Sequence, residues 1–384
     1  MTRFIIHHPS FIILGLSLII PAVVGGSVPP TTAEGFLVPQ PGGELSFPAD
    51  HGSHPDYKIE WWYLTGHLAA ESGREFGFQA TFFRSALRPP EERADGGEAF
   101  GDDQLYLAHM AVTDVDGERF HHEERLNRGG WDADAAVGEL DVRNGNWSLR
   151  ALGEAAEHPM QLVFTVEDEV AVDLVLTPRK ALLRFGEDGT SRKGADPTAR
   201  SFYLTWSRLA AEGTVVLGEE TLAVTGQAWM DHEIASQQLG DDLAGWDWTA
   251  IHLEDGWEVK AYILRREDGS PSPFSALMWI DPEGKVAYRG AEAFTWETAQ
   301  WWTSPETGAR YPVGVDLTTE DPRTGESITF ALRPRLAAQE LSTGSAGFAY
   351  WEGACTVQGA GGEHVGLAYL ELVGYGGEAT RGLR

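Results

Sequence analysis

Short runs in which apolar and polar residues alternate make up most of the chain. Examples are "EWWYLTGHLAAESGREFGFQATFFR" and "RSFYLTWSRLAAEGTVVLG", both rich in aromatic and β-branched residues. Alternation of period two places successive side chains on opposite faces of a strand. Beyond the N-terminal segment, no long stretch shows the 3.6-residue period of a helix. Turn signals such as Asp116–Gly117 recur at hairpin spacing. The pattern predicts an all-β fold, a β-sandwich or a β-barrel.

A weak internal repeat divides this pattern into two halves. "WWYLTGHL" (61–68) and "WDWTAIHL" (246–253) share aromatic residues at their first and third positions and end in His-Leu. Each is followed by a turn and a second strand. We interpret the repeat as duplication of a β-domain. The predicted domains cover 46–236 and 237–380, with the boundary in the polar stretch "IASQQLGDDLAG".

The second copy predicts a specific hairpin. With a three-residue loop at Glu254–Asp255–Gly256, Leu253 pairs with Trp257, and strand geometry then sets every other pair. One face of this hairpin would carry Trp246, Trp248, Ala250, His252, Glu258, Lys260, Tyr262 and Leu264, with His252 opposite Glu258 and Trp248 opposite Tyr262. Such a face suits the wall of a partly polar cavity. The alternative is an aromatic exterior crossed by ordinary salt bridges.

The first residues indicate export from the cytoplasm. Arg3 precedes an apolar run, Phe11–Val24, and small residues end the segment at Gly26. This layout is typical of a secretory signal peptide over residues 1–26. The alternative is an uncleaved membrane anchor, for which the apolar run is short. We therefore expect a secreted or periplasmic protein without stable membrane insertion after cleavage.

Charge and motif content narrow the function classes. The net charge of −29 disfavours nucleic acid and anionic membranes as partners. A single cysteine, Cys355, cannot form an internal disulfide. The chain has no nucleophile elbow, no zinc-protease motif and no glycine-rich nucleotide loop. His51 and His54 could ligate a metal, but a turn is the favoured interpretation, so we expect neither metal nor cofactor.

Three adjacent ionisable residues, Asp231, His232 and Glu233, are the first candidates for chemistry. In a strand His232 points to one side and its two neighbours to the other, so the three cannot form a self-contained triad. An inward His232 needs an acidic partner from another strand, and the candidates are Glu60, Asp247 and Glu258. A histidine oriented in this way can act as a general acid or base. The alternative is a histidine that caps a turn at the domain junction.

Glu60 is the second candidate, because it stands beside Trp61, Trp62 and Tyr63. Burial without a partner would raise the pKa of Glu60, and the neutral acid could protonate a substrate. The alternative is an exposed Glu60 at a sheet edge, paired with Lys58 or Arg84.

Several motifs in the same order resemble the AttH/carotenoid 1,2-hydratase family. They are "HPDYKIEWWYLTGHL", "FGFQATFFR", "LAHMAVTD", "RSFYLTWSRL", "TGQAWMDHE", "GWDWTAIHLEDG" and "YWEGACTV…GLAYLELVGY". The resemblance covers about Phe47 to Tyr375. It implies two tandem lipocalin-like β-barrel domains, with a ligand pocket in or between the barrels. Described members act on apolar, polyene-like molecules; the hydratases add water to a terminal carbon–carbon double bond.

The resemblance implies acid catalysis without a cofactor. Asp231, Glu60 or His232 would protonate an alkene, and aromatic faces would stabilise the carbocation by cation–π contact. The implied ligand-binding residues are Trp61, Tyr63, Trp246, Asp247, Trp248 and Tyr262. Where the hydratases have an aromatic residue soon after the histidine, this chain has Glu233 and Ile234, which places it closer to the AttH branch.

Two hypotheses follow from the sequence. The first is a secreted, hydratase-type lyase acting on an apolar unsaturated substrate. The second is a periplasmic, lipocalin-like carrier of a hydrophobic small molecule. The enzyme predicts that Glu60, Asp231 or His232 faces the main cavity. The carrier predicts a cavity lined by Trp and aliphatic side chains, with all three residues held in structural hydrogen bonds at the domain junction.

Overall fold

A computed structural model describes most of the chain after the N-terminal segment. The described residues are 28–93, 103–130, 132–155, 157–186, 188–237, 239–240, 242–342 and 349–376. The predicted signal peptide, residues 1–26, lies outside them. The elements are almost all strands, as predicted, with three short 3-10 helices at Ala49–His51, Pro90–Glu92 and Ala291–Ala293. Among the described residues no helix is long and apolar enough to cross a membrane.

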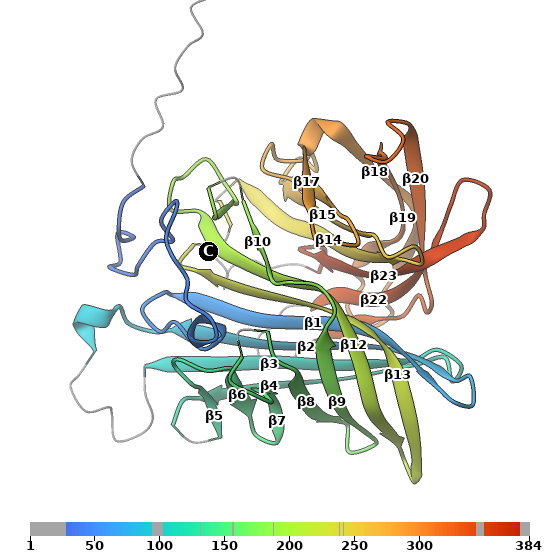
Figure 1. Cartoon of the computed structure of the whole chain (residues 1–384), viewed down its shortest axis with the longest axis horizontal. Helices are drawn as coiled ribbons and strands as arrows, with labels where there is room; N and C mark the ends of the chain where they lie inside the picture. The colour runs from blue at the N-terminus through green and yellow to red at the C-terminus, as the bar shows by residue number, and fades with distance from the viewer. Residues whose placement is uncertain are drawn as a thin grey trace, which may run out of the picture.

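The first sheet is a nearly closed barrel of 13 strands (Figure 1). Its path runs β4-β3-β2-β1-β13-β12-β9-β8-β7-β6-β5, and β10 and β11 both pair with β12. Its strands are β1 (Ile59–Ala70), β2 (Glu75–Ala86), β3 (Gln104–Asp114), β4 (Arg119–Arg128), β5 (Ala133–Ala135), β6 (Asp141–Asn144), β7 (Trp147–Ala151), β8 (Met160–Val166), β9 (Val170–Pro178), β10 (Leu183–Phe185), β11 (Ser191–Arg192), β12 (Arg200–Leu217) and β13 (Glu220–Ala235).

The second sheet has 10 strands and curls into a half-barrel (Figure 1). Its path runs β17-β16-β15-β14-β23-β22-β20-β19-β18, and β21 pairs with β22. Its strands are β14 (Leu243–Leu253), β15 (Glu258–Arg266), β16 (Ala276–Ile280), β17 (Val286–Gly290), β18 (Phe294–Thr303), β19 (Arg310–Glu320), β20 (Ser327–Pro334), β21 (Glu340–Ser342), β22 (Ala349–Gln358) and β23 (His364–Val373).

Both sheets place their first strand in the same way. β1 lies between β2 and β13, the next strand and the last strand of its sheet, and β14 lies likewise between β15 and β23. The chain passes from one sheet to the other between Ala235 and Leu243, within the stretch where the sequence predicts a boundary. The all-β fold with two tandem barrel-like halves is therefore confirmed, while the predicted domain limits at 46–236 and 237–380 stay predictions.

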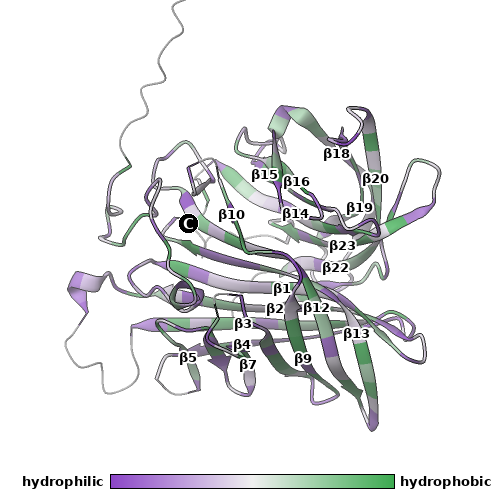
Figure 2. Cartoon of the chain, viewed as in Figure 1, coloured by the Kyte–Doolittle hydropathy of each residue, from purple (hydrophilic) through white to green (hydrophobic). Residues whose placement is uncertain are grey.

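Strand alternation gives the first sheet two buried faces. Along β1 and β13, Trp62, Leu64 and Met230 point into the barrel and join its apolar core. Tyr63 and Trp229, their neighbours in sequence, point the other way and pack against the second sheet. Figure 2 shows hydrophobic and hydrophilic stretches mixed along the strands that carry these two faces. Because both faces of this sheet are buried, the polar groups on its second face must find hydrogen-bond partners within the protein.

We call the contact between the two sheets the interface layer. Its aromatic and apolar members come from both sheets: Tyr63, Phe185, Tyr203, Trp229, Leu239, Leu243, Trp248, Ala250, Tyr262, Leu264, Met278, Ile280, Ala354 and Tyr369. The sheets approach so closely that a Cβ at Gly77 on β2 would lie 2.5 Å from the Cβ of Ala354 on β22. A side chain at position 77 would clash with Ala354, so the glycine allows β2 and β22 to pack closely.

Candidate functional site

Glu60 and His232 meet on the barrel side of β1 and β13. Antiparallel pairing sets Trp62 opposite His232 and Glu60 opposite Ile234. The His232 Nε2 lies 2.9 Å from the Glu60 Oε1, and the imidazole stacks on Trp62 at 4.8 Å between ring centroids. The prediction that His232 takes an acidic partner from another strand is confirmed, and among the three candidates the partner is Glu60.

The Glu60 carboxylate is surrounded by hydrogen-bond donors. Oε1 also contacts the His54 Nδ1 at 2.8 Å, and Oε2 accepts from the Arg84 Nε at 3.0 Å, the His54 backbone N–H at 2.8 Å and the Ser53 hydroxyl at 3.2 Å. Glu60 and Arg84 are both fully buried. Pairing with Arg84 was one sequence expectation and is confirmed, but the exposed sheet edge that went with it is wrong.

The protonation of Glu60 and His232 is opposite to the one that an acid catalyst needs. Burial alone would raise the pKa of Glu60, but the hydrogen bonds from His232 and His54 and the charge of Arg84 hold it well below its usual value. The predicted rise is therefore wrong, because Glu60 is buried with partners rather than without them. Burial lowers the pKa of His232 despite its bond to Glu60, so at neutral pH a neutral imidazole faces an ionised carboxylate.

Asp231 and Glu233 point to the opposite side, into the interface layer, as alternation predicts. Asp231 accepts from the Tyr203 hydroxyl at 2.6 Å, from the Trp229 Nε1 at 2.9 Å and from the Thr205 hydroxyl. The Lys260 Nζ from the second sheet lies 3.5 Å from its Oδ1. Glu233 pairs with the Lys193 Nζ at 3.2 Å. Both carboxylates thus tie strands together.

The predicted hairpin has the expected register. Trp248 pairs with Tyr262 and His252 with Glu258 on β14 and β15, and the Leu253 N–H donates to the Trp257 carbonyl at 2.9 Å. The aromatic face is neither exterior nor the wall of the described cavity, since it packs against the first sheet in the interface layer. There the charged residues have partners; Glu258, for example, bonds Lys180 and Arg208 at 2.5 Å each.

Five of the six predicted ligand-binding residues belong to the interface layer or pack against it. Tyr63, Trp248 and Tyr262 are buried in it, and Trp61 and Trp246 pack at its edge. Asp247 does not join them, because alternation turns it to the other face of β14. There it accepts from the Arg265 Nε at 2.9 Å and the Tyr375 hydroxyl at 3.0 Å. Its predicted place beside a ligand is not supported by this geometry.

Two glutamates of the second sheet complete the layer. Glu352 on β22 and Glu371 on β23 are direct cross-strand partners. The Tyr63 hydroxyl donates to the Glu352 Oε2 at 3.1 Å, and the Trp246 Nε1 donates to the Glu371 Oε2 at 2.9 Å. Burial, then the neighbouring Glu371, raises the pKa of Glu352 well above its usual value. Burial raises the pKa of the partly buried Glu371 to about 8. Both shifts favour the protonated form of the carboxyl group.

Several buried polar atoms of this layer form no hydrogen bond to the described residues, among them the Tyr369 hydroxyl and the Lys260 Nζ. Two others, the Glu352 Oε1 and the Trp248 Nε1, lie on either side of Tyr63. Tyr63 connects them, because its ring meets Trp248 edge-to-face at 5.2 Å and its hydroxyl bonds Glu352. Buried polar atoms are nearly always paired, with protein, water or ligand. The layer therefore has hydrogen-bonding capacity to offer to another molecule.

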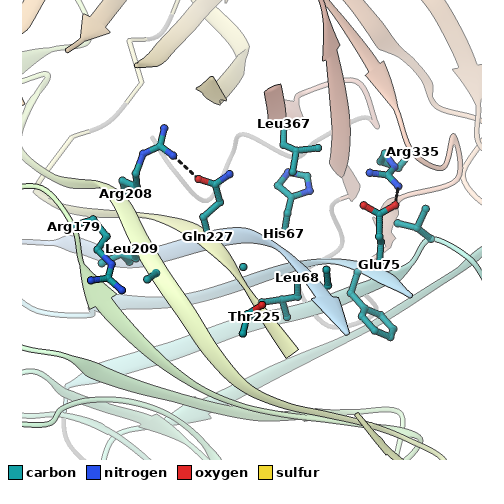
Figure 3. Close-up of a pocket in the computed structure, with 15 residues that line it drawn as sticks. His67, Leu68, Glu75, Arg179, Arg208, Leu209, Thr225, Gln227, Arg335 and Leu367 are labelled. Carbon is teal, nitrogen blue, oxygen red and sulfur yellow. Dashed lines mark hydrogen bonds and ion pairs between the residues drawn. The ribbon is translucent and has the colours of Figure 1, made fainter. Parts of the chain in front are cut away.

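A cavity of about 460 Å³ opens where the two sheets meet, near the end of β1 (Figure 3). His67, Arg208, Gln227 and Leu367 line it from both sheets, and none of Glu60, Asp231 and His232 does so. His67 lines the cavity and also contacts the interface layer, since its ring centroid is 5.9 Å from that of Tyr369. The pKa of Tyr369 is raised by burial and then by the nearby Glu352.

Comparison with known proteins places the chain in a family. The sequence profile of the AttH-like family matches residues 38–375. The chain belongs to the AttH-like family. No curated protein matches it in sequence. The crystal structure of an AttH-type protein from Nitrosomonas europaea is similar, with 33% identity and a TM-score of 0.76, covering 87% of this chain and 98% of that one.

More distant structures share the fold of this AttH-like protein. Kievitone hydratase from Nectria haematococca has 14% identity and a TM-score of 0.63, over 90% of this chain and 98% of that one. CghA in complex with Sch210972 has 16% identity and a TM-score of 0.51, over 89% and 97%. At these identities the likeness establishes the fold alone.

One group of the AttH-like chain has the composition of a metal site. The donor atoms of His54, Glu60 and His232 all lie within 4.8 Å of one another, the only such group among the described residues. Both imidazoles, however, contact the same Glu60 Oε1 at hydrogen-bond distance, and the Arg84 guanidinium occupies Oε2. A buried cation beside Arg84 would add like charge, so these residues fit a hydrogen-bond network better than a metal centre.

Sequence reasoning missed Glu352 and Glu371, although both lie in motifs that carry the family resemblance. Each interrupts an otherwise apolar strand, in "AYWEGACTV" and "LAYLELVGY". A lone carboxyl in an apolar strand is costly to bury in its charged form. That interruption was the available signal, and alternation would have placed Glu371 on the face of Tyr369.

Proposed function

We propose that this AttH-like protein adds water to a carbon–carbon double bond of an apolar, unsaturated molecule, with Glu352 as the acid. The observation that carries the proposal is the state of Glu352. It is fully buried beside Tyr63, burial raises its pKa well above the usual value, and one of its oxygens has no partner among the described residues. A carboxylic acid held neutral in this way can deliver a proton where water cannot.

The reaction needs few groups. The proton of Glu352 passes to one alkene carbon, and the other carbon becomes a carbocation. The rings of Tyr63, which bonds Glu352, and of Trp248, which contacts Tyr63, stabilise this cation, each by about 0.5–2 kcal/mol. Water bonds to the cationic carbon and returns a proton to the Glu352 carboxylate, so the product is an alcohol and the enzyme is regenerated. No residue is consumed.

Glu371 supports this role through its position. An ionised Glu371 directly opposite would repel the carboxylate that Glu352 becomes after proton transfer. Burial raises the pKa of Glu371 and so reduces this repulsion, while the hydrogen bond from the Trp246 N–H acts in the opposite direction. Kievitone hydratase, which shares the fold, is named for a hydration, and this agrees with the proposal at the level of fold analogy. The N-terminal pattern supports a secreted or periplasmic location.

The test is water addition by purified protein. We would incubate the wild type with a lipid extract in ¹⁸O-labelled water and search by mass spectrometry for products that gain one labelled hydroxyl. Glu352→Gln keeps the shape and removes the transferable proton, so product formation should fall by about 10²–10⁴-fold, typical of a lost general acid. Glu340→Gln is the matched control, since Glu340 is another buried glutamate, held by Tyr311 and Thr307 away from the layer. Undiminished product from Glu352→Gln would refute the role.

A non-catalytic carrier is the second candidate. It is favoured by one specific observation: Glu60, Asp231 and His232 are all held in structural hydrogen bonds and none lines the described cavity. In that case the wild type and Glu352→Gln would both return the same unmodified ligand from the extract.

A further inference from the structure

The cavity at the junction of the two sheets is lined by more basic than acidic residues, whereas the chain as a whole is acidic. Overall, acidic residues outnumber basic ones, with 58 Asp and Glu against 29 Lys and Arg. The cavity lining carries three arginines, Arg179, Arg208 and Arg335, and a single acidic residue, Glu75. Figure 3 shows Arg179 and Arg208 on one side, Arg335 and Glu75 on the other, and His67 and Gln227 between them.

The positive charge is in excess on the Arg179 side. Arg335 is neutralised by its ion pair with Glu75. Arg208 shares the buried Glu258 with Lys180, so two cations stand against one carboxylate. Arg179 is exposed, and its guanidinium has no hydrogen bond or ion pair to any described residue. A surface with this excess favours an anion.

The rest of the lining is apolar or neutral. Leu68, Phe76, Leu209 and Leu367 are its large apolar residues; the first three are almost fully buried in the barrel core, and Leu367 is partly exposed. Burial lowers the pKa of His67 to about 4, so this ring is uncharged at neutral pH. The cavity therefore offers an excess of positive charge on the Arg179 side and uncharged groups beside it, and His67 contacts Tyr369 of the interface layer. A ligand with one anionic end and an apolar body matches both parts.

We propose that this cavity binds the carboxylate of an amphiphilic, unsaturated acid, with Arg179 as the principal contact and Arg208 beside it. The apolar body of the ligand extends past Leu367 toward the interface layer. The inference rests on the proposed function in taking an unsaturated chain as the apolar body. Recognition of the carboxylate does not depend on the proposed function, because binding requires no catalysis.

The experiment uses the full chain and a fluorescent polyene acid, cis-parinaric acid, as the probe. Oleic acid, oleyl alcohol, acetate and inorganic phosphate serve as competitors. We expect oleic acid to displace the probe at least tenfold more effectively than oleyl alcohol. Arg179→Gln should remove most of that preference, weakening the acid about tenfold and leaving the alcohol unchanged. Arg119→Gln, an exposed arginine on β4 away from the cavity, should behave as the wild type.

Three results would overturn the inference. Equal competition by the acid and the alcohol would show that the carboxylate is not recognised. Equal weakening of both by Arg179→Gln would show a general effect on the fold. Displacement by acetate or phosphate alone at micromolar concentration would show a site for free anions rather than amphiphiles. Repeating the assay on Glu352→Gln separates the two proposals, since the acid preference should survive there even if catalysis is lost or never existed.

Discussion

Glu60 and Glu352 are the same residue type, both fully buried, on the two sheets of one molecule. Glu60 receives hydrogen bonds from His54, Ser53, Arg84 and His232 and is ionised. Among the described residues, Glu352 receives one side-chain hydrogen bond, from Tyr63, and it faces another glutamate across the strand pair. Burial acts in the same direction on both, so the surrounding donors and charges decide which carboxyl keeps its proton.

This contrast separates architecture from chemistry. A carboxylate with its lone pairs filled and a buried guanidinium beside it has little to gain from a substrate. A neutral carboxyl with an unpaired oxygen still has a proton to give and a bond to make. We therefore assign the Glu60 cluster to holding β1 and β13 in place and the Glu352 pair to the proposed reaction. Each prediction below tests one part of that assignment.

The largest expected effect comes from Glu60→Gln. This change leaves the Arg84 charge buried without its counterion, and removing one partner of a buried pair costs about 3–5 kcal/mol of unfolding free energy. Glu352→Gln replaces a neutral acid by a neutral amide of the same shape and should cost less than about 1 kcal/mol. Denaturant unfolding at pH 7 measures both. Equal losses for the two variants would remove the distinction between the sites.

The sequence predicts a good part of this picture. Alternation around Asp231, His232 and Glu233 correctly separates the histidine from its neighbours, and it correctly pairs Trp248 with Tyr262 and His252 with Glu258. Such inferences succeed because strand geometry has a fixed period of two. They depend on neighbours within one strand or one hairpin, which the chain order specifies.

What the sequence does not predict depends on contacts between distant strands. The donors around Glu60 come from residues 53 and 54, β2 and β13, and only their sum sets the direction of its pKa. Glu352 meets Tyr63 across 289 positions of sequence. No local pattern states that one glutamate will be surrounded by donors and another by aromatic rings, so the protonation states of the two could not be assigned in advance.

The pH dependence of stability should carry the opposite signatures of the two sites. A lowered pKa means that the contribution of Glu60 to stability is present above the usual glutamate pKa near 4.5 and is lost as the pH falls. The raised pKa of Glu371 means that its contribution is full below about 4.5 and is lost as the pH rises to about 8. Between these two pH values, a buried carboxyl group with a raised pKa lowers the free energy of unfolding by up to about 1.4 kcal/mol for each pH unit.

The measurement is the unfolding free energy of the wild type and Glu371→Gln from about pH 3 to pH 9. Between pH 5 and 8 the unfolding free energy of the variant should fall less steeply than that of the wild type, because the Glu371 carboxyl is gone. In acid, both proteins should lose the same stability as Glu60 is protonated. Parallel curves across this range would mean that Glu371 is ionised in the folded protein, and the protonated pair would then be wrong.

The smallest effect should come from two tryptophans of the interface layer whose rings lie 6.2 Å apart. The Trp229 Nε1 donates to Asp231, whereas the Trp248 Nε1 has no partner among the described residues. Each Trp→Phe change removes similar apolar surface, but only Trp229→Phe also takes a donor from a buried carboxylate. We expect Trp229→Phe to cost about 1–2 kcal/mol more than Trp248→Phe in denaturant unfolding. If Trp248→Phe were the costlier change, its N–H would be bonded in solution, and the unfilled hydrogen-bonding capacity beside Glu352 would already be occupied.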